Sequence, residues 1–511
     1  MSHWIIAPIL LPLFAGLVLL LGARWSQRTQ RGLALVATAA LLPIALLLLN
    51  RAADGAIQVY ALGDWPAPFG IVLVLDRLAA LMLALTALLA LPALLYALRG
   101  SDLRGRNFHA LFQLQLLGLN GAFLTGDLFN LFVFFEILLI ASYALLLHGQ
   151  GPARARAGLH YVVLNLIGSS LFLFAVGVLY GITGTLNMAD LAVRVAQAGS
   201  ADAPLLRAGA LLLLVVFALK AALLPLYFWL PRAYAAACAP VAALFAIMTK
   251  VGVYAILRVY TLIFGPEAGL LADVALPWLW PLGLATLALG ALGALAATDL
   301  RTLIAYLVVV SVGTLLAGIA LGTPPALAAA LYYLLHSTLT TGALFLLAGI
   351  IRGQRGSQGD QLAQAPPVLQ PALLGSLFFI AAMAVVGMPP LSGFIGKLLL
   401  LTAPEPGVQA AWLWGTLLGG SLVALIALSR AGSRLFWRTL EQPAVAARAD
   451  RVQLLSAVSL LAAAPLLAVF AEPVTAYTQA TAWQLAAPAG YIGAVLEHLQ
   501  PSQYAQGGPA R

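Results

Sequence analysis

Long apolar stretches follow one another along nearly the whole chain, with short polar connections between them. A helix that crosses about 30 Å of hydrocarbon needs ~20 apolar residues. Only 8% of the residues are charged, against about 25% in a soluble domain, so one apolar core with a wet surface is excluded. The sequence therefore predicts an all-α polytopic membrane protein. About fourteen transmembrane helices are expected, at 4–22, 33–49, 76–98, 108–125, 128–147, 158–181, 208–230, 240–262, 276–297, 301–321, 326–350, 372–402, 411–436 and 453–471.

The arginines predict the orientation. Of the 26 basic residues, three are lysine, and most arginines fall in the loops that follow odd-numbered predicted helices. Because cytoplasmic loops carry the excess of Lys and Arg, these loops are expected inside and both termini outside. The net charge of +9 has the same origin, since no basic run is interleaved with aromatic residues as in a nucleic-acid surface. The first apolar stretch precedes its charges, which indicates a membrane helix and not a cleaved signal peptide.

Three segments outside the membrane carry their own patterns. Residues 50–75 alternate around a Pro/Gly turn, which predicts an outer hairpin. Residues 186–200 are typical of a short amphipathic helix on the outer surface, and 486–500 are expected to form another. None of these segments is long enough to be a separate catalytic domain.

Soluble-type catalysis has no motif here. The single cysteine, Cys238, excludes a disulfide within the chain and a cysteine-based metal site. The sequence contains no Gly-rich phosphate loop, metal cluster or nucleophile triad. We therefore expect no cofactor and no metal, and a transporter in place of an enzyme.

Five ionisable residues lie well inside predicted spans, although a charge at a helix centre costs roughly 2.5–3.5 kcal/mol on insertion scales. They are Glu136, Lys220, Lys250, His336 and Lys397. One interpretation is that they form ion pairs that lock helices together, but one glutamate cannot pair with three lysines. Likewise, a lone histidine in a core is often packing, although the hydroxyls of "HSTLTT" beside His336 favour a relay.

The choice of lysine inside the membrane is informative. All three lysines of the chain are at mid-span, whereas the solvated cations are arginines. Desolvation lowers the pKa of a buried lysine toward neutrality, whereas arginine stays protonated. The pattern predicts a proton relay in which Glu136 modulates Lys220 and in which Lys250, His336 and Lys397 carry the proton onward.

Prolines interrupt two of the long spans. One break is at Pro225, five residues after Lys220, and the other at Pro389 and Pro390, before Lys397. Proline frees a backbone carbonyl, and in lipid such a break is tolerated only against protein or a watered cavity. Paired broken helices point to an inverted-repeat transporter with its ion path near the midplane.

Four pieces of sequence are similar to a known family. They are "DLFNLFVFFEILLIASYALLLHG", "KAALLPLYFWLPRAYAAACAPVAALFAIMTKVGVYAILRVY", "DLRTLIAY" and "MPPLSGFIGK". These resemble the antiporter-like subunits shared by respiratory complex I and the multisubunit Mrp (Mnh, Pha) cation/proton antiporters, with the D-type Mrp subunits as the nearest fit. The resemblance covers about residues 60–440. It implies a hydrated axis through Glu136, Lys220, Lys250 and Lys397, and a place in the bacterial cytoplasmic (inner) membrane.

The resemblance also implies an organisation. A single membrane domain, 1–511, would comprise helices 1–3 and the hairpin (1–105), a first inverted five-helix repeat (106–265), a second (270–440), and helix 14 with an outer tail (450–511). Two positions depart from the family: Ser311 stands where relatives often have histidine, and Thr341 where they often have lysine. Either water held by Ser311, Thr340 and Thr341 fills this part of the route, or the route differs.

Three functions remain open from the sequence. The first is a proton-translocating subunit of a Na⁺/H⁺ or K⁺/H⁺ antiporter. The second is a proton-pumping N-type subunit of complex I or of a membrane-bound hydrogenase, and the third is an assembly subunit without flux. Because one glutamate faces three lysines, partner chains of a hetero-oligomer are expected to supply counter-charges. Membrane lipid, H⁺ and Na⁺ or K⁺ are the other expected partners.

Overall fold

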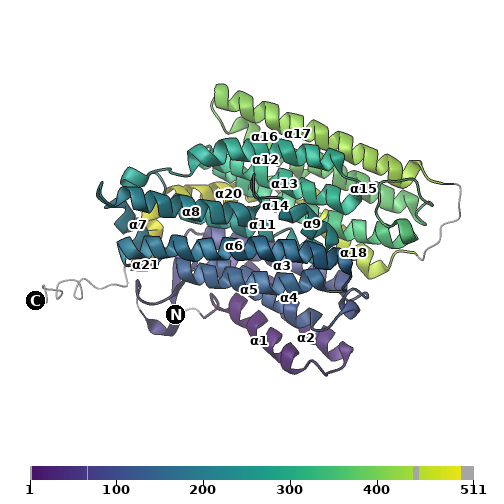
Figure 1. Ribbon diagram of the computed structural model, residues 1–511, viewed down its shortest axis with the longest axis horizontal. Coiled ribbons are helices and arrows are strands. Elements are labelled where there is room, and N and C mark those ends of the chain that lie inside the picture. The colour runs from purple at the N-terminus through teal and green to yellow at the C-terminus, as the bar shows by residue number, and fades with distance from the viewer. Residues whose placement is uncertain (1–2, 66, 441–447, 497–511) are drawn as a thin grey trace, which may run out of the picture.

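Nearly parallel helices make up almost the whole molecule (Figure 1). The computed structural model describes residues 3–65, 67–440 and 448–496. The chain begins with α1 and α2 along one side, and α17 lies along the opposite side (Figure 1). The all-helical prediction is confirmed.

The N-terminal part contains three helices and the predicted hairpin: α1 Ala7–Leu21, α2 Gln27–Ala52, β1 Gln58–Ala61, η1 Leu62–Asp64, β2 Val72–Leu75 and α3 Arg77–Ala97. The strands are antiparallel, with Gln58 opposite Leu75. Strand β2 is buried along its whole length, which anchors the hairpin to the bundle. Residue 66, in the predicted turn, lies outside the described residues.

The middle of the chain is a succession of helices of unequal length: η2 Asp102–Arg104, α4 Phe108–Leu124, α5 Leu128–Leu147, α6 Pro152–Thr183, α7 Met188–Ala196, α8 Ala203–Ala221, α9 Trp229–Ala236, α10 Ala239–Phe245 and α11 Met248–Leu262. Asp127 caps α5 by accepting a hydrogen bond from the Asn130 N–H at 2.8 Å. Helix α6 is followed by Gly184, in the left-handed conformation that favours glycine. Helix α7 matches the predicted amphipathic segment and buries Met188, Leu191 and Val195.

The second half repeats the alternation of long and short helices: η3 Gly269–Leu271, α12 Leu276–Ala296, α13 Leu300–Ile319, α14 Pro324–Gln354, η4 Gly356–Gln358, α15 Pro371–Val386, α16 Ser392–Thr402, α17 Val408–Gly432 and the π-helix η5 Ser433–Trp437. Helices α11, α13 and α14 are almost wholly buried, whereas only 33% of the apolar stretch is buried in α2 and in α17. The core therefore lies along α11, α13 and α14, which carry Lys250 and His336 among the predicted membrane charges.

Both predicted helix breaks are present. Residues 222–228 separate α8 from α9, and residues 387–391 separate α15 from α16. At the first break, the Leu224 N–H donates to Thr286 Oγ1 at 2.9 Å and the Trp229 indole donates to the Leu219 carbonyl at 3.0 Å. Protein groups thus satisfy the backbone that the break leaves without helical partners, as low-dielectric surroundings require.

The C-terminal part differs from its prediction. The helices of this part are α18 Arg451–Leu461, α19 Ala463–Val469, α20 Ala471–Ala486 and α21 Pro488–Leu496. Helices α18 and α19 cover the last predicted span, 453–471, and α20 follows directly as an additional packed helix. Helix α20 packs along α14, and the Tyr477 hydroxyl donates to the Arg77 carbonyl at 3.1 Å. Hydropathy missed this helix because its buried positions are small or hydroxylated, such as Thr478, Thr481 and Ala482. Residues 497–511 of the predicted tail lie outside the described residues.

Helices occupy all fourteen predicted spans, but their lengths vary. Within the described ranges, eleven stretches are long and apolar enough to cross a membrane, and three shorter apolar helices accompany them. This result establishes a multi-span membrane protein, while the number of crossings stays a prediction.

Helices α8 and α11 cross at a glycine. A Cβ on Gly252 would lie 2.4 Å from the Ala221 nitrogen and 2.8 Å from the Lys220 carbonyl carbon. We expect Gly252→Ala to lower the free energy of unfolding by about 1–3 kcal/mol, because the crowded atoms are backbone and cannot rotate away. The measurement is the apparent Tm of the detergent-solubilised protein.

The matched control is Gly177→Ala on α6, where an added Cβ meets nothing within 4 Å. Its Tm should stay equal or rise, because alanine is the better helix former. Equal Tm values for the two variants would show that the α8–α11 crossing is not tight.

Candidate functional site

The first cluster of polar groups surrounds the end of α8. Lys220 lies in the last turn of α8 and is buried. Its Nζ donates to the side-chain oxygen of Asn165 on α6 at 3.2 Å, and lies 3.4 Å from the Asn165 carbonyl. The partner of this lysine is therefore an amide on a neighbouring helix and not a carboxylate.

Glu136 is near this lysine but does not touch it. In the part of the chain that the structure describes, no ion pair within 4.0 Å joins the two residues. The carboxylate of Glu136 accepts a short hydrogen bond from the hydroxyl of Ser169, which lies one turn after Asn165. Helix α6 thus places an amide and a hydroxyl between the predicted pair.

Asn165 and Ser169 were not among the candidates from the sequence. Both are small polar residues inside the predicted span 158–181, four residues apart and hence on one face of a helix. Uncharged polar residues are common in membrane helices because they join neighbouring helices. A search for uncharged partners of Lys220 at this spacing would have found them.

The second cluster joins α11, α13 and α14. Lys250 is fully buried, and its Nζ donates to Ser311 Oγ at 3.2 Å. Ser311 in turn donates to Ser337 Oγ at 3.2 Å. Ser311 therefore lies between Lys250 and Ser337.

Two threonines complete the predicted middle of the route. Thr341 donates to the Ser337 carbonyl on its own helix at 2.6 Å. The Thr340 hydroxyl is buried and has no hydrogen-bond partner among the described residues. Ser337, like Asn165, was not singled out by the sequence, although it belongs to the hydroxyl-rich run after His336.

The third cluster lies around the second helix break. His336 Nδ1 is 2.8 Å from Ser392 Oγ, at the start of α16. Lys397 Nζ donates to the carbonyls of Val385 and Val386 at 3.0 and 2.7 Å, and to Ser421 Oγ at 2.7 Å. These two carbonyls end α15 just before Pro389 and Pro390, so the lysine satisfies the backbone at the break.

The structure brings the five predicted residues into three local clusters and not into one continuous chain. Neighbouring residues of α14, His336 and Ser337, face different clusters and so place them side by side. Gly252, two residues after Lys250, contacts the backbone of Lys220. Within the described residues, no hydrogen bond crosses either of these two junctions, and no group of three His, Cys, Asp or Glu side chains has the arrangement of a metal site.

The buried lysines bind hydroxyl, amide and carbonyl partners inside a multi-span helical bundle with two broken helices. This combination is typical of membrane transport proteins. Residues 125–426 match the transmembrane model of the NADH:quinone oxidoreductase/Mrp antiporter family. The chain belongs to this family.

Proteins of known name and structure resemble the chain over almost its full length. The D-type subunit of a probable K⁺/H⁺ antiporter from Rhizobium meliloti strain 1021 is 44% identical, covering 97% of this chain and 98% of that one. The D-type subunit of the Na⁺/H⁺ antiporter of Bacillus subtilis strain 168 is 38% identical, covering 97% and 100%. A chain of the Mrp complex from Dietzia sp. DQ12-45-1b has a TM-score of 0.88 at 28% identity, covering 97% and 100%.

Proposed function

We propose that this chain is the proton-translocating subunit of a multisubunit monovalent cation/proton antiporter, a secondary transporter and not an enzyme. The observation that carries the proposal is the bridge from Lys220 through Asn165 and Ser169 to Glu136. The named relatives support antiport, and they include one K⁺/H⁺ and one Na⁺/H⁺ protein. The similarity to a chain of the Mrp complex supports assembly with partner chains. We propose the bacterial cytoplasmic membrane as the location of this assembly.

In this proposal the titratable groups take up and release the proton, and the hydroxyls connect them. Burial favours the neutral form of a lysine, whereas a nearby carboxylate favours the charged form. Ser169 both donates to Glu136 and lies 3.0 Å from the Asn165 carbonyl. A change in its contacts would alter how strongly Glu136 holds the proton on Lys220, which is the coupling step that we propose.

From Lys220 the proposed route runs to Lys250 and then through Ser311 and Ser337 to His336 and Lys397. A hydroxyl both donates and accepts hydrogen bonds, so it can pass a proton between titratable neighbours. Three steps of this route have no direct hydrogen bond within the described residues: Lys220 to Lys250, Ser337 to His336, and His336 to Lys397. At these points the route requires water or a side-chain movement.

We further propose that the fourteen helical segments are fourteen crossings and that 106–265 and 270–440 are inverted repeats. The breaks at 222–228 and 387–391 support this arrangement, since each lies in one of the two proposed repeats. The excess of arginine at one end of the bundle supports the predicted cytoplasmic face.

Lys220→Arg tests the need for a titratable group. We expect cation/proton exchange to fall about a hundredfold, because arginine keeps the charge but does not release its proton. The assay uses everted vesicles from an antiporter-deficient host that expresses the whole operon, with dequenching of a pH dye on addition of Na⁺ or K⁺. Wild-type exchange in Lys220→Arg would contradict the relay, and the absence of cation-driven dequenching in the wild-type complex would contradict antiport.

Two adjacent serines on α6 test the bridge. Ser169 is buried and bonds Glu136, whereas Ser170 is exposed and bonds only the Leu166 carbonyl of its own helix. We expect Ser169→Ala to lower exchange about tenfold, since an alanine neither donates nor accepts a hydrogen bond. Ser170→Ala should exchange at the wild-type rate in the same assay. Equal rates for the two variants would remove Ser169 from the pathway.

A further inference from the structure

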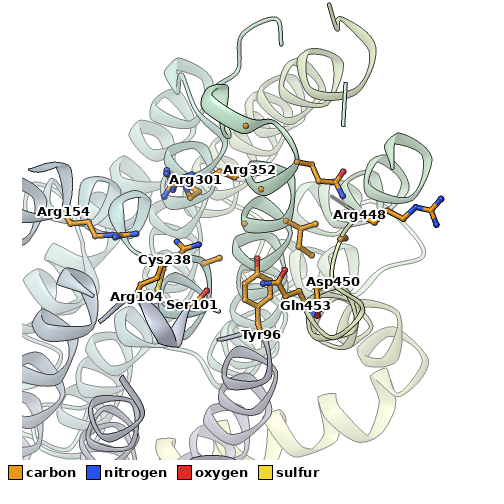
Figure 2. Close-up of a pocket in the computed structure, with 17 residues that line it drawn as sticks. Tyr96, Ser101, Arg104, Arg154, Cys238, Arg301, Arg352, Arg448, Asp450 and Gln453 are labelled. Carbon is orange, nitrogen blue, oxygen red and sulfur yellow. The ribbon is translucent and has the colours of Figure 1, made fainter. Parts of the chain in front are cut away.

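A cavity of about 520 Å³ opens at the arginine-rich end of the bundle (Figure 2). It lies among the ends of α3 and α14 and the starts of α10 and α18. Tyr96, Gln354 and Gln453 contribute polar groups to its wall. The proton route described above does not use this cavity.

Four arginines from separate segments line the cavity. Arg104 comes from η2, Arg154 from the first turn of α6, Arg301 from the first turn of α13 and Arg352 from the end of α14. Their guanidinium groups gather at one end of the cavity, whereas Arg448 points away (Figure 2). We call these four residues the arginine pocket. Arg104 and Arg301 are close enough for their positive charge to act on Arg154, and all three act on Arg352.

The carboxylates near the arginine pocket do not balance it. Asp360 accepts a hydrogen bond from Arg301 at 2.8 Å and lies 4.0 Å from Arg352. Asp450, which lines the cavity, pairs with Arg99 at 2.7 Å. Among the described residues that line or contact the arginine pocket, four guanidinium groups therefore face one carboxylate that is free to offset them.

The start of α6 increases this excess. The positive end of a helix dipole favours anions and disfavours cations. Helix α6 begins after Gly151 with no side-chain cap and no acidic residue in its first turn, yet Arg154 lies there. The Arg154 side chain bonds the Ala236 and Gln150 carbonyls at 3.0 and 3.1 Å, which fixes its position without neutralising its charge.

Membrane orientation alone does not explain this convergence. The positive-inside rule needs arginines in loops, where each can be solvated separately. Here Arg154 and Arg301 are half-buried, and four segments hold their charges around one cavity. Guanidinium groups match phosphate oxygens by bidentate hydrogen bonds, and basic pockets between helices at the cytoplasmic face bind lipid headgroups.

We propose that the arginine pocket binds a phosphate-bearing anion, and that its occupant is the headgroup of an anionic phospholipid. The cavity is of the size that holds small ligands, about 300–1,000 Å³. The surplus of three positive charges suits a phosphate and opposes a cation. Binding at this end would hold η2 and helices α6, α13 and α14 together at one face of the membrane.

Lipid binding to the purified complex tests the proposal without any transport assay, so its outcome is independent of the proposed antiport. Isothermal titration with dioctanoylphosphatidylglycerol is compared with dioctanoylphosphatidylcholine and with inorganic phosphate. The test variant is Arg104→Gln/Arg154→Gln. The matched control is Arg106→Gln/Arg156→Gln, which changes two exposed arginines on the same segments that do not line the cavity.

We expect the anionic lipid to bind more tightly than the other two probes, and the affinity to fall about tenfold for each guanidinium removed from the pocket. The control variant should bind as the wild type does. In another outcome, inorganic phosphate binds as tightly as the lipid and loses affinity equally in the pocket variant. That result would support phosphate recognition by the pocket, with a soluble phosphate and not a lipid headgroup as the occupant.

Two results would overturn the proposal. In one, the pocket and control variants bind the anionic lipid equally. In the other, the pocket variant keeps its lipid affinity but loses partner subunits on purification, which would assign the arginines to an acidic partner surface. The Tm and the yield of each variant are measured beside the titration, so that a folding defect is not mistaken for lost binding.

Discussion

The whole interior depends on meeting the hydrogen-bonding needs of a charged amine in a low-dielectric bundle. An unpaired charge there is costly, yet none of the three lysines forms an ion pair within the described part of the chain. The structure supplies an amide for Lys220, a serine for Lys250, and two carbonyls and a serine for Lys397. Because these partners are neutral, they stabilise each amine without fixing its charge as a carboxylate in contact would. A group that exchanges protons needs this kind of surrounding.

Both helix breaks occur next to such a lysine, and the two arrangements differ. At α8 the lysine precedes the break, and Thr286 and Trp229 form hydrogen bonds with the backbone groups that have no helical partner. At α15 the lysine follows the break and itself takes the freed carbonyls. A broken helix and a buried charge are each unfavourable in the membrane without hydrogen-bond partners. At α15 they satisfy each other, because the lysine donates to the carbonyls that the break leaves free.

The sequence predicted what depends on period and composition. The helical segments, the hairpin and the positions of the breaks follow from apolar runs, alternating residues and proline. It also singled out Glu136, Lys220, Lys250, His336 and Lys397, which all lie in helices, because an ionisable residue inside an apolar run is conspicuous. It did not find Asn165, Ser169 or Ser337, since a single small polar residue in a membrane helix carries little signal. It ended the last helix at 471, because α20 is buried through threonine and alanine and not through large apolar side chains.

The three acceptors around Lys397 have a further consequence. A protonated lysine carries three N–H donors, and the structure provides three oxygens, from Val385, Val386 and Ser421. A neutral amine has only two N–H groups, so the departure of the proton leaves one oxygen without its donor. If that oxygen is a carbonyl at the end of α15, the helix terminus must find another partner. The protonation state of the Lys397 Nζ atom and the conformation of the broken helix are thereby linked. The conformation at the break then depends on whether this lysine is charged.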